Sequence, residues 1–123
     1  MKRILLVEDD VLLGKAIVES LSEANLEMTW AKTGTEVFEI LKSQTPDLVY
    51  LDIMLPDIDG YAVLKKMKDD ANYQSIPVVM LTNLGQMSEI SKAMEMGAAD
   101  YIIKANIDLE KLAELTHKKY LPD

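Results

Sequence analysis

The sequence predicts an α/β fold: a single (βα)5 domain in which a doubly wound, five-stranded parallel sheet is covered by helices on both faces. Five short apolar segments alternate with five segments of helical periodicity along the 123 residues. Such alternation indicates βα units joined by right-handed crossovers. Three of the apolar segments are hydrophobic at consecutive positions, as is typical of strands buried on both faces. No linker or low-complexity run divides the chain, so one domain is expected over residues 1–123.

The strand segments are defined by their apolar residues and by the polar residues that bound them. They are predicted at about 3–8, 27–31, 47–52, 76–82 and 99–104. The second segment differs from its neighbours, because Leu26, Met28 and Trp30 alternate with polar residues. This alternation is expected of a strand at the edge of a sheet.

A helical segment follows each strand, and its apolar residues recur at the i, i+3 and i+4 spacing of one helix face. In chain order these stripes are Leu13, Ala16, Ile17, Ser20, Leu21 and Ala24; Val37, Phe38 and Leu41; Val63, Leu64 and Met67; Met87, Ile90 and Met94; and Leu109, Leu112, Ala113 and Thr116. Gly60 opens the third helix and Gly97 closes the fourth, while Asp108 is placed to cap the fifth.

Composition and charge argue against several classes of function. The net charge of −8 repels phosphate backbones, so direct binding of nucleic acid is not expected. The absence of cysteine excludes disulfides and thiolate metal sites, and the single histidine, His117, argues against a multi-histidine metal site. No apolar run approaches the roughly 18 residues of a membrane span. We therefore expect a cytoplasmic protein with no membrane contact.

Polar residues stand at the carboxyl ends of four predicted strands, and in an open parallel sheet that edge is where ligands bind. They are Glu8, Asp9 and Asp10 after the first strand, Asp52 at the end of the third, Thr82 at the end of the fourth and Lys104 at the end of the fifth.

If the first and third strands are neighbours, Glu8, Asp9 and Asp52 converge. Two carboxylates about 4 Å apart repel by about 4 kcal/mol at an effective dielectric constant of about 20, so three of them need counter-charges. Lys104 supplies one, and a divalent cation, Mg2+ or Mn2+, suits the remaining oxygen ligands. An aspartate beside a metal, a lysine and the Thr82 hydroxyl is equipped to accept a phosphoryl group.

These segments together resemble the receiver domain of two-component response regulators, the family of the chemotaxis regulator. Asp52–Gly60 is similar to the family's phosphoacceptor loop and Val7–Asp10 to its acid loop. Thr82 resembles the switch hydroxyl, Tyr101 the switch aromatic, and Asp100–Lys104 the lysine loop. The resemblance covers essentially the whole chain and implies the flavodoxin-like strand order 2-1-3-4-5.

By that resemblance, Asp52 receives a phosphoryl group from a sensor histidine kinase or a phosphotransfer protein in a reaction that requires Mg2+. Asp9 is then the main side-chain ligand of the metal, Glu8 acts partly through water, and Met54 contributes its backbone carbonyl. Lys104 and Asp52 complete the site. The domain is thus expected to be a signalling receiver, which acts on itself, rather than an enzyme with a free substrate.

The resemblance also implies an output. Thr82 and Tyr101 would relay phosphorylation to a protein-interaction face formed by the fourth helix, fifth strand and fifth helix. The partner is expected to be a downstream effector or an output domain, since no effector domain is expected within residues 1–123. A phosphorylation-dependent homodimer remains open.

Two residues depart from the family's pattern. Ala105 replaces the usual proline after Lys104, so a trans peptide bond is expected there. Asn83 replaces the usual small residue after Thr82. Both departures leave open an alternative, a receiver-fold module that binds proteins with impaired or absent phosphorylation.

Two enzyme-like or ligand-binding alternatives fit less well. Aspartyl-phosphate phosphatases and transferases carry the motif Asp-x-Asp, in which the second acid serves as general acid. In this chain the residue two positions after Asp52 is Met54. A flavin or nucleotide binder of this topology needs a phosphate loop after the first strand, where Glu8–Asp10 would repel phosphate.

Other polar and aromatic residues are given structural roles. Asp10 is predicted to cap the first helix, and Asp57 and Asp59 to be solvated turn acids. His117 is predicted on a helix surface. Trp30 is predicted to pack on the edge strand, away from the site.

Overall fold

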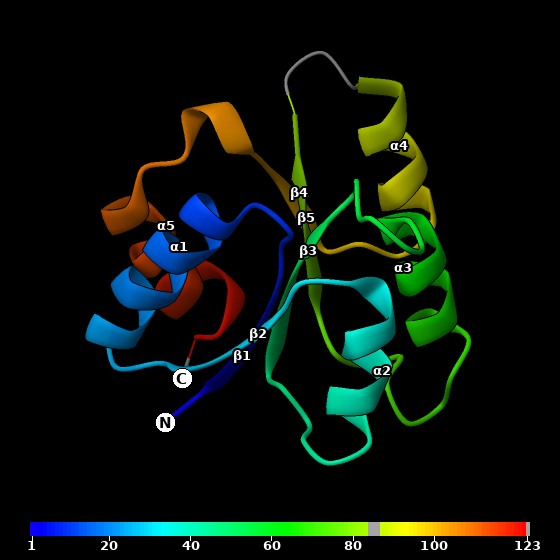
Figure 1. Ribbon diagram of the computed structural model, residues 1–123, viewed down its shortest axis with the longest axis horizontal. Coiled ribbons are helices and arrows are strands. Elements are labelled where there is room, and N and C mark those ends of the chain that lie inside the picture. Colours follow the sequence, from blue (N-terminus) through cyan, green and yellow to red (C-terminus); the bar gives the residue numbers. More distant parts are fainter. Residues whose placement is uncertain (84–86, 123) are drawn as a thin grey trace.

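The protein is a parallel sheet between two layers of helices, in a computed structural model that describes residues 1–83 and 87–122 (Figure 1). The strands are β1 (Arg3–Val7), β2 (Glu27–Ala31), β3 (Leu48–Asp52), β4 (Val78–Thr82) and β5 (Asp100–Ile103), and the helices are α1 (Val11–Glu23), α2 (Gly34–Leu41), α3 (Gly60–Lys68), α4 (Met87–Glu95) and α5 (Leu109–Leu115). The sheet order is β2-β1-β3-β4-β5 and all pairs are parallel. The predicted fold class and strand order are confirmed.

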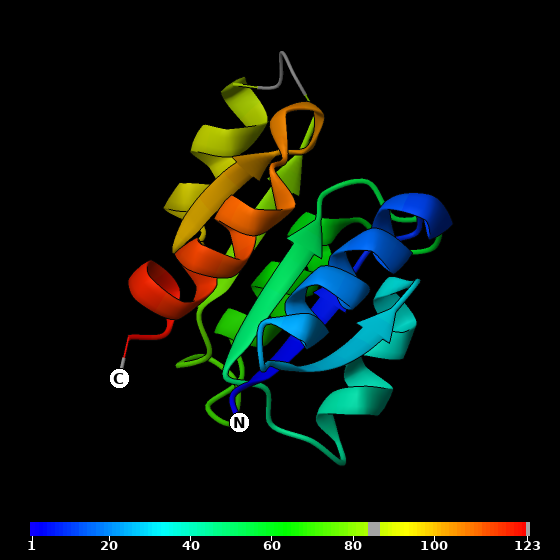
Figure 2. The ribbon, with the colours of Figure 1, turned by 90° about the vertical axis from the view of Figure 1, so that its left-hand side faces the viewer.

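The helices divide between the two faces of the sheet. Helices α1 and α5 cover one face, and α2, α3 and α4 cover the other (Figures 1 and 2). A 3₁₀ turn, Lys104–Asn106, connects β5 to α5, and a π-helical turn, Thr116–Tyr120, continues α5. None of the helices in the described part of the chain is long and apolar enough to cross a membrane.

Strands β3 and β4 are buried at every position, as their continuous hydrophobic character predicts. All five residues of β3 and all five of β4 are buried. The one phenol among them, Tyr50, lies 2.5 Å from Thr116 Oγ1, measured from its hydroxyl oxygen. A buried hydroxyl without a partner would cost roughly 1–3 kcal/mol, so this bond lets a polar ring occupy the core. It also fixes the end of α5 against the sheet.

Helix caps agree with the sequence at most positions. Asp10 accepts a hydrogen bond from the Leu13 N–H at 3.1 Å, and Asp108 caps α5 as predicted. Asp59 is exposed, as predicted for a turn acid, but it also caps α3. Gly97 follows α4 with a φ of +107°, the left-handed conformation that glycine adopts readily at helix ends.

The predicted apolar stripe of α4 is wrong at one position. Ile90 is buried as expected, but Met94 is 40% exposed. Ala93 is buried instead and belongs to the hydrophobic cluster that includes Val78 and Met80 of β4. The side chain of Met87 lies outside the described residues. The stripe was mispredicted because the helix turns its alanine, rather than its larger methionine, toward the closely packed sheet.

Candidate acidic site at the carboxyl edge of the sheet

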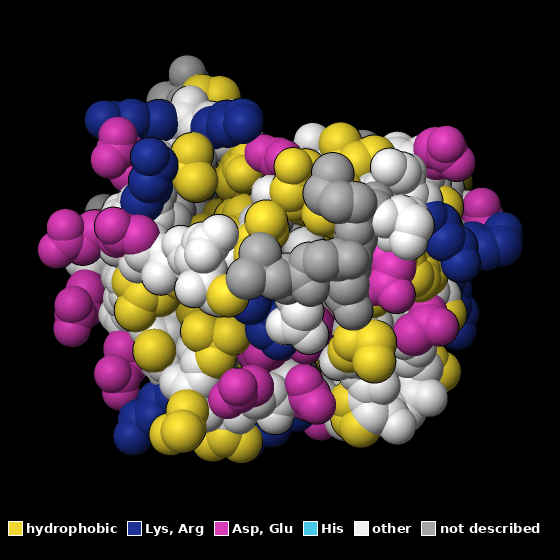
Figure 3. Space-filling model, turned by 90° about the horizontal axis from the view of Figure 1, so that it is seen from above, with side chains coloured by type: hydrophobic (Ala, Val, Ile, Leu, Met, Phe, Trp, Pro, Cys, Tyr) yellow, Lys and Arg dark blue, Asp and Glu magenta, His cyan; other side chains and the backbone are white. Residues whose placement is uncertain are grey.

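Polar side chains gather where the strands end, at the edge that Figure 3 shows from above. β1 and β3 are adjacent and parallel, with Val7 opposite Leu51, so the next residues, Glu8 and Asp52, become neighbours. Carboxylate oxygens of Glu8, Asp9 and Asp52 lie within 4.8 Å of one another. An open depression of about 570 Å³, here called the acidic depression, lies at this edge. It is lined by Asp9, Asp10, Leu13, Asp52, Met54, Asn83, Lys104 and Ala105.

Lys104 bridges the two buried carboxylates. Its Nζ lies 2.7 Å from Glu8 Oε1 and 3.0 Å from Asp52 Oδ2. Glu8 is fully buried, and Asp52 is 2% exposed. The other oxygen of Asp52, Oδ1, accepts a hydrogen bond from the backbone N–H of Met54 at 3.1 Å. The Asp52 carboxylate is therefore oriented on both sides by groups from different segments of the chain.

Burial dominates the electrostatics of Glu8. Desolvation, together with the nearby Asp52, raises the pKa of Glu8 to about 8, and Lys104 only partly opposes this. Burial lowers the pKa of Lys104, but its contacts with Glu8 and Asp52 outweigh that effect and raise it overall. Glu8 Oε2 is buried and has no hydrogen-bond partner within the residues described.

This arrangement fits a hard divalent cation. With Glu8 protonated, the carboxylates of Asp9 and Asp52 and one ammonium leave one uncompensated negative charge, and a dication that displaces the Glu8 proton would meet two. The Glu8 Oε2 atom is buried without a hydrogen bond. Each of the three side chains in the cluster offers a carboxylate oxygen as a metal ligand. Oxygen donors with open positions suit Mg2+ or Mn2+. Asp9 is exposed, so the site is accessible from solvent.

The predicted switch residues lie beside this cluster rather than in it. Thr82, at the end of β4, is fully buried, and its hydroxyl donates to the Asn83 carbonyl at 3.3 Å. Tyr101 is 36% exposed on the edge strand β5. Neither is among the residues that line the acidic depression. The peptide bond before Ala105 is trans, as expected.

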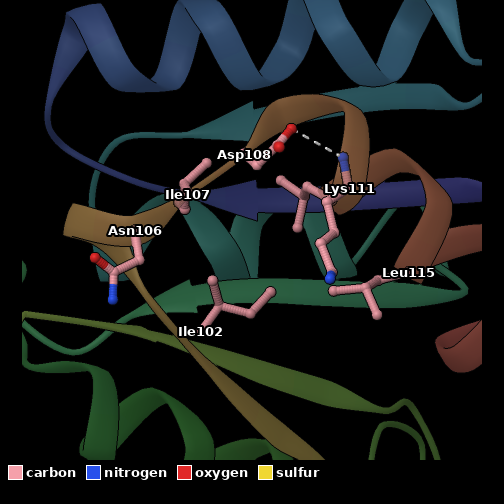
Figure 4. Close-up of a pocket in the computed structure, with 7 residues that line it drawn as sticks. Ile102, Asn106, Ile107, Asp108, Lys111 and Leu115 are labelled. Atoms are coloured by element: carbon pink, nitrogen blue, oxygen red, sulfur yellow. Dashed lines mark hydrogen bonds between the residues drawn. The ribbon is translucent and has the colours of Figure 1, made fainter.

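A smaller cavity of about 100 Å³ lies apart from these carboxylates, between β5 and α5 (Figure 4). Its lining is largely apolar and consists of Ile102, Asn106, Ile107, Asp108, Lys111, Leu112 and Leu115. Asp108 uses its carboxylate to cap α5 through the Lys111 N–H. Because this cavity holds no cluster of charged groups, the acidic depression is the better candidate for chemistry.

Two side chains, those of Trp30 and Asp57, make hydrogen bonds that were not predicted from the sequence. Trp30 does lie on the edge strand, but its Nε1 donates to the Glu8 carbonyl at 2.9 Å, so the prediction that it packs away from the site was wrong. Asp57 is exposed as predicted, yet its carboxylate accepts hydrogen bonds from the N–H groups of Gly34 and Thr35 at the start of α2. His117 is exposed, as predicted. No local sequence signal reveals the bonds of Trp30 and Asp57, which join segments more than 20 residues apart.

Comparison with known proteins identifies the family. The response regulator receiver domain model matches residues 4–117. The probable transcriptional regulator ycf27 of Cyanophora paradoxa is 35% identical over 103 residues, 84% of this chain and 42% of that protein. This chain thus spans less than half the length of the first curated relatives it matches.

Solved structures share the whole fold. A putative response regulator from Chloroflexus aurantiacus superposes with a TM-score of 0.87 at 29% identity, covering 94% of this chain and 93% of that one. The Mn2+-bound form of response regulator Rcp1 has a TM-score of 0.85 at 25% identity, covering 98% and 95%. The chemotaxis branch is not specifically supported, because curated relatives such as ycf27 are probable transcriptional regulators. Since the family model spans nearly all of the sheet and its helices, this chain belongs to the response regulator receiver family and is a receiver domain of two-component signalling.

Proposed function

We propose that Asp52 is the phosphoacceptor of this receiver and that the donor is a phosphohistidine on a sensor histidine kinase or a phosphotransfer protein. The observation that carries the proposal is the setting of the Asp52 carboxylate. It is almost fully buried, it lies in a cluster with Glu8 and Asp9, and Lys104 and the Met54 N–H orient it from two sides.

The transfer would be a simple displacement at phosphorus. An Asp52 carboxylate oxygen forms the new P–O bond while the P–N bond to the donor histidine breaks. The electron pair of that bond stays on the imidazole nitrogen, which takes up a proton. Lys104 is placed to neutralise charge on the phosphoryl oxygens, and catalysis rests on positioning and charge stabilisation.

Glu8, Asp9 and Asp52 would hold a Mg2+ ion, with the Met54 backbone carbonyl as a further ligand. Mn2+ is the alternative, as in the Mn2+-bound relative. The ion would neutralise charge on the phosphoryl group and on the carboxylates. The buried Glu8 oxygen without a hydrogen bond supports this assignment.

The output would be a change on a protein-interaction face. Thr82 and Tyr101 lie on the neighbouring strands β4 and β5, so a rearrangement beside Asp52 could pass through Thr82 to the exposed Tyr101 ring. The recipient would be a cytoplasmic effector, an output domain or a second copy of the receiver. The curated relatives, which are longer transcriptional regulators, support an output of this kind.

A second candidate, a protein-binding receiver with impaired phosphorylation, is favoured by one observation. Both residues that depart from the family's pattern, Asn83 and Ala105, line the acidic depression. They lie where an incoming phosphodonor would pass.

Intact-mass spectrometry separates the two candidates. The protein is incubated with acetyl phosphate, with and without Mg2+. We expect one added phosphoryl group per chain only with Mg2+, and none in Asp52→Asn. Asp10→Asn is the matched control, because Asp10 lines the same depression but caps α1, and it should still be modified. No added mass on the wild-type protein would favour the second candidate, and addition to Asp52→Asn would refute the choice of Asp52.

A further inference from the structure

Trp30, the one tryptophan of the chain, connects the edge strand β2 to the acid loop, Val7–Asp10. Its indole is held in place on more than one side. The Nε1–H donates to the Glu8 carbonyl at 2.9 Å, and Lys32 Nζ lies 4.7 Å from the ring centroid.

The ring also packs against α1 where that helix has no side chain. A Cβ atom built on Gly14 would lie 2.2 Å from Cζ2 of Trp30, so the indole occupies the space that any larger residue would need. Glycine in a helix interior costs about 1 kcal/mol relative to alanine. The contact with Trp30 gives a physical reason for a glycine at this position.

The last two residues of β2 hold the backbone of Glu8 at both of its polar groups. The Glu8 N–H donates to the Ala31 carbonyl at 3.0 Å, and the Glu8 carbonyl accepts from Trp30. Because the peptide unit is planar, fixing this carbonyl also fixes the plane from which Asp9 departs. The two acids that flank this peptide unit are both members of the carboxylate cluster.

We propose that Trp30 is a positioning residue for the metal site: its indole N–H orients the Glu8–Asp9 peptide so that both carboxylates face Asp52. This inference rests on the proposed metal site of the receiver. It goes beyond that proposal, because Trp30 touches none of the proposed ligand atoms and acts only through the backbone that carries them. Removal of a group that orients metal ligands through hydrogen bonds commonly weakens metal binding by about 10-fold or more.

The same geometry makes Trp30 an internal reporter of the site. Its emission is the only tryptophan emission of the protein, and its N–H bonds to the loop that would carry the metal ligands. A cation bound by Glu8 and Asp9 should change that emission. This readout needs no variant and no phosphoryl transfer.

The test compares Mg2+ affinity, by calorimetry, among four proteins. Trp30→Phe keeps an apolar ring but removes the donor, and we expect Mg2+ binding to weaken by about 10-fold. Gly14→Ala keeps Trp30 and favours the helix, yet its Cβ displaces the ring, so we expect weaker Mg2+ binding without loss of folding. Tyr73→Phe is the matched control: it removes another aromatic donor to a backbone carbonyl, that of Leu41, and should bind Mg2+ like the wild type.

The outcomes separate this inference from the proposed function. If the wild type binds no Mg2+, the metal site itself is refuted, and the positioning role falls with it. If the wild type binds Mg2+ but Trp30→Phe and Gly14→Ala bind it equally well, only the positioning role is refuted. A wild-type emission that stays constant while calorimetry shows saturation would also overturn it.

Discussion

At the scale of single residues, Glu8 carries the main electrostatic conflict of the metal-free site. It is fully buried and next to Asp52, and its short ion pair with Lys104 does not offset both effects. Its pKa in the folded protein is about 8, against a reference value of 4.5. Between these values the folded protein holds a proton that the unfolded chain has lost.

The sign of the resulting pH dependence follows directly. Because the folded state binds more protons, Glu8 makes the free energy of unfolding fall as pH rises from about 4.5 to about 8. We expect the difference in unfolding free energy between the metal-free wild type and Glu8→Gln to change across this window, with the variant gaining stability relative to the wild type at higher pH. Urea titrations in a metal chelator at several pH values measure it. A difference that does not depend on pH would contradict the raised pKa of Glu8.

The limits of sequence reasoning are clearest for individual side chains. The polar strand ends were predicted because each follows an apolar run, and the sheet order then brings Glu8 next to Asp52. The Trp30 bond could not be predicted in that way. It depends on the rotamer of the indole and on the lack of a side chain at Gly14, a residue from another element.

At the scale of secondary-structure elements, the loop between β3 and α3 is tied to α2 through Asp57. Its carboxylate accepts hydrogen bonds from the Gly34 N–H at 2.8 Å, the Thr35 N–H at 2.9 Å and the Thr35 hydroxyl. The bond with the Thr35 hydroxyl is the main cause that lowers the pKa of Asp57, and the backbone bonds add to it. A negative charge at a helix N-terminus is also favoured by the helix dipole.

We therefore expect Asp57→Asn to lower the melting temperature by a few degrees at neutral pH. The stabilisation of an acid with a lowered pKa is present above the unfolded pKa and is lost as pH falls through the folded one. The difference between wild type and variant should consequently disappear only in strong acid. Asp69→Asn, which removes an exposed acid paired with Lys65 on α3, is the control and should change little. Equal melting temperatures for the two variants would show that the hydrogen bonds from Asp57 to the start of α2 do not stabilise the fold.

The order and extent of the elements were predictable because the two kinds of element differ in hydrophobic pattern. Apolar residues recur every three or four positions in the helices, whereas the strands are short apolar runs or alternate with polar residues. Boundaries agree to within one or two residues for the strands, as for β4, predicted at 76–82 and observed at Val78–Thr82. The strand order, in contrast, came from the family resemblance and not from periodicity. Contacts such as that between Asp57 and α2 depend on this order, so periodicity alone could not have given them.

At the scale of the whole molecule, the sheet concentrates negative charge at one edge of a chain whose net charge is already −8. Each face of the sheet has its own hydrophobic cluster, and the acidic edge lies at the ends of the strands that separate them. Above the raised pKa of Glu8, where all three carboxylates are ionised, their mutual repulsion opposes folding. A bound dication would reverse the sign of that contribution.

Thermal melts of the wild type and Asp52→Asn, with and without Mg2+, test this directly. Without metal, at a pH above about 8 where Glu8 is ionised, we expect Asp52→Asn to melt at or above the wild-type temperature, because the substitution relieves repulsion with Glu8. With Mg2+ at about 100 times its dissociation constant, binding should stabilise the wild type by about 2.7 kcal/mol, and the variant by less because it lacks one ligand. Sodium chloride at equal ionic strength controls for screening. A metal-free variant that melts well below the wild type, or an equal gain from Mg2+ in both, would show that carboxylate crowding does not govern the stability of this edge.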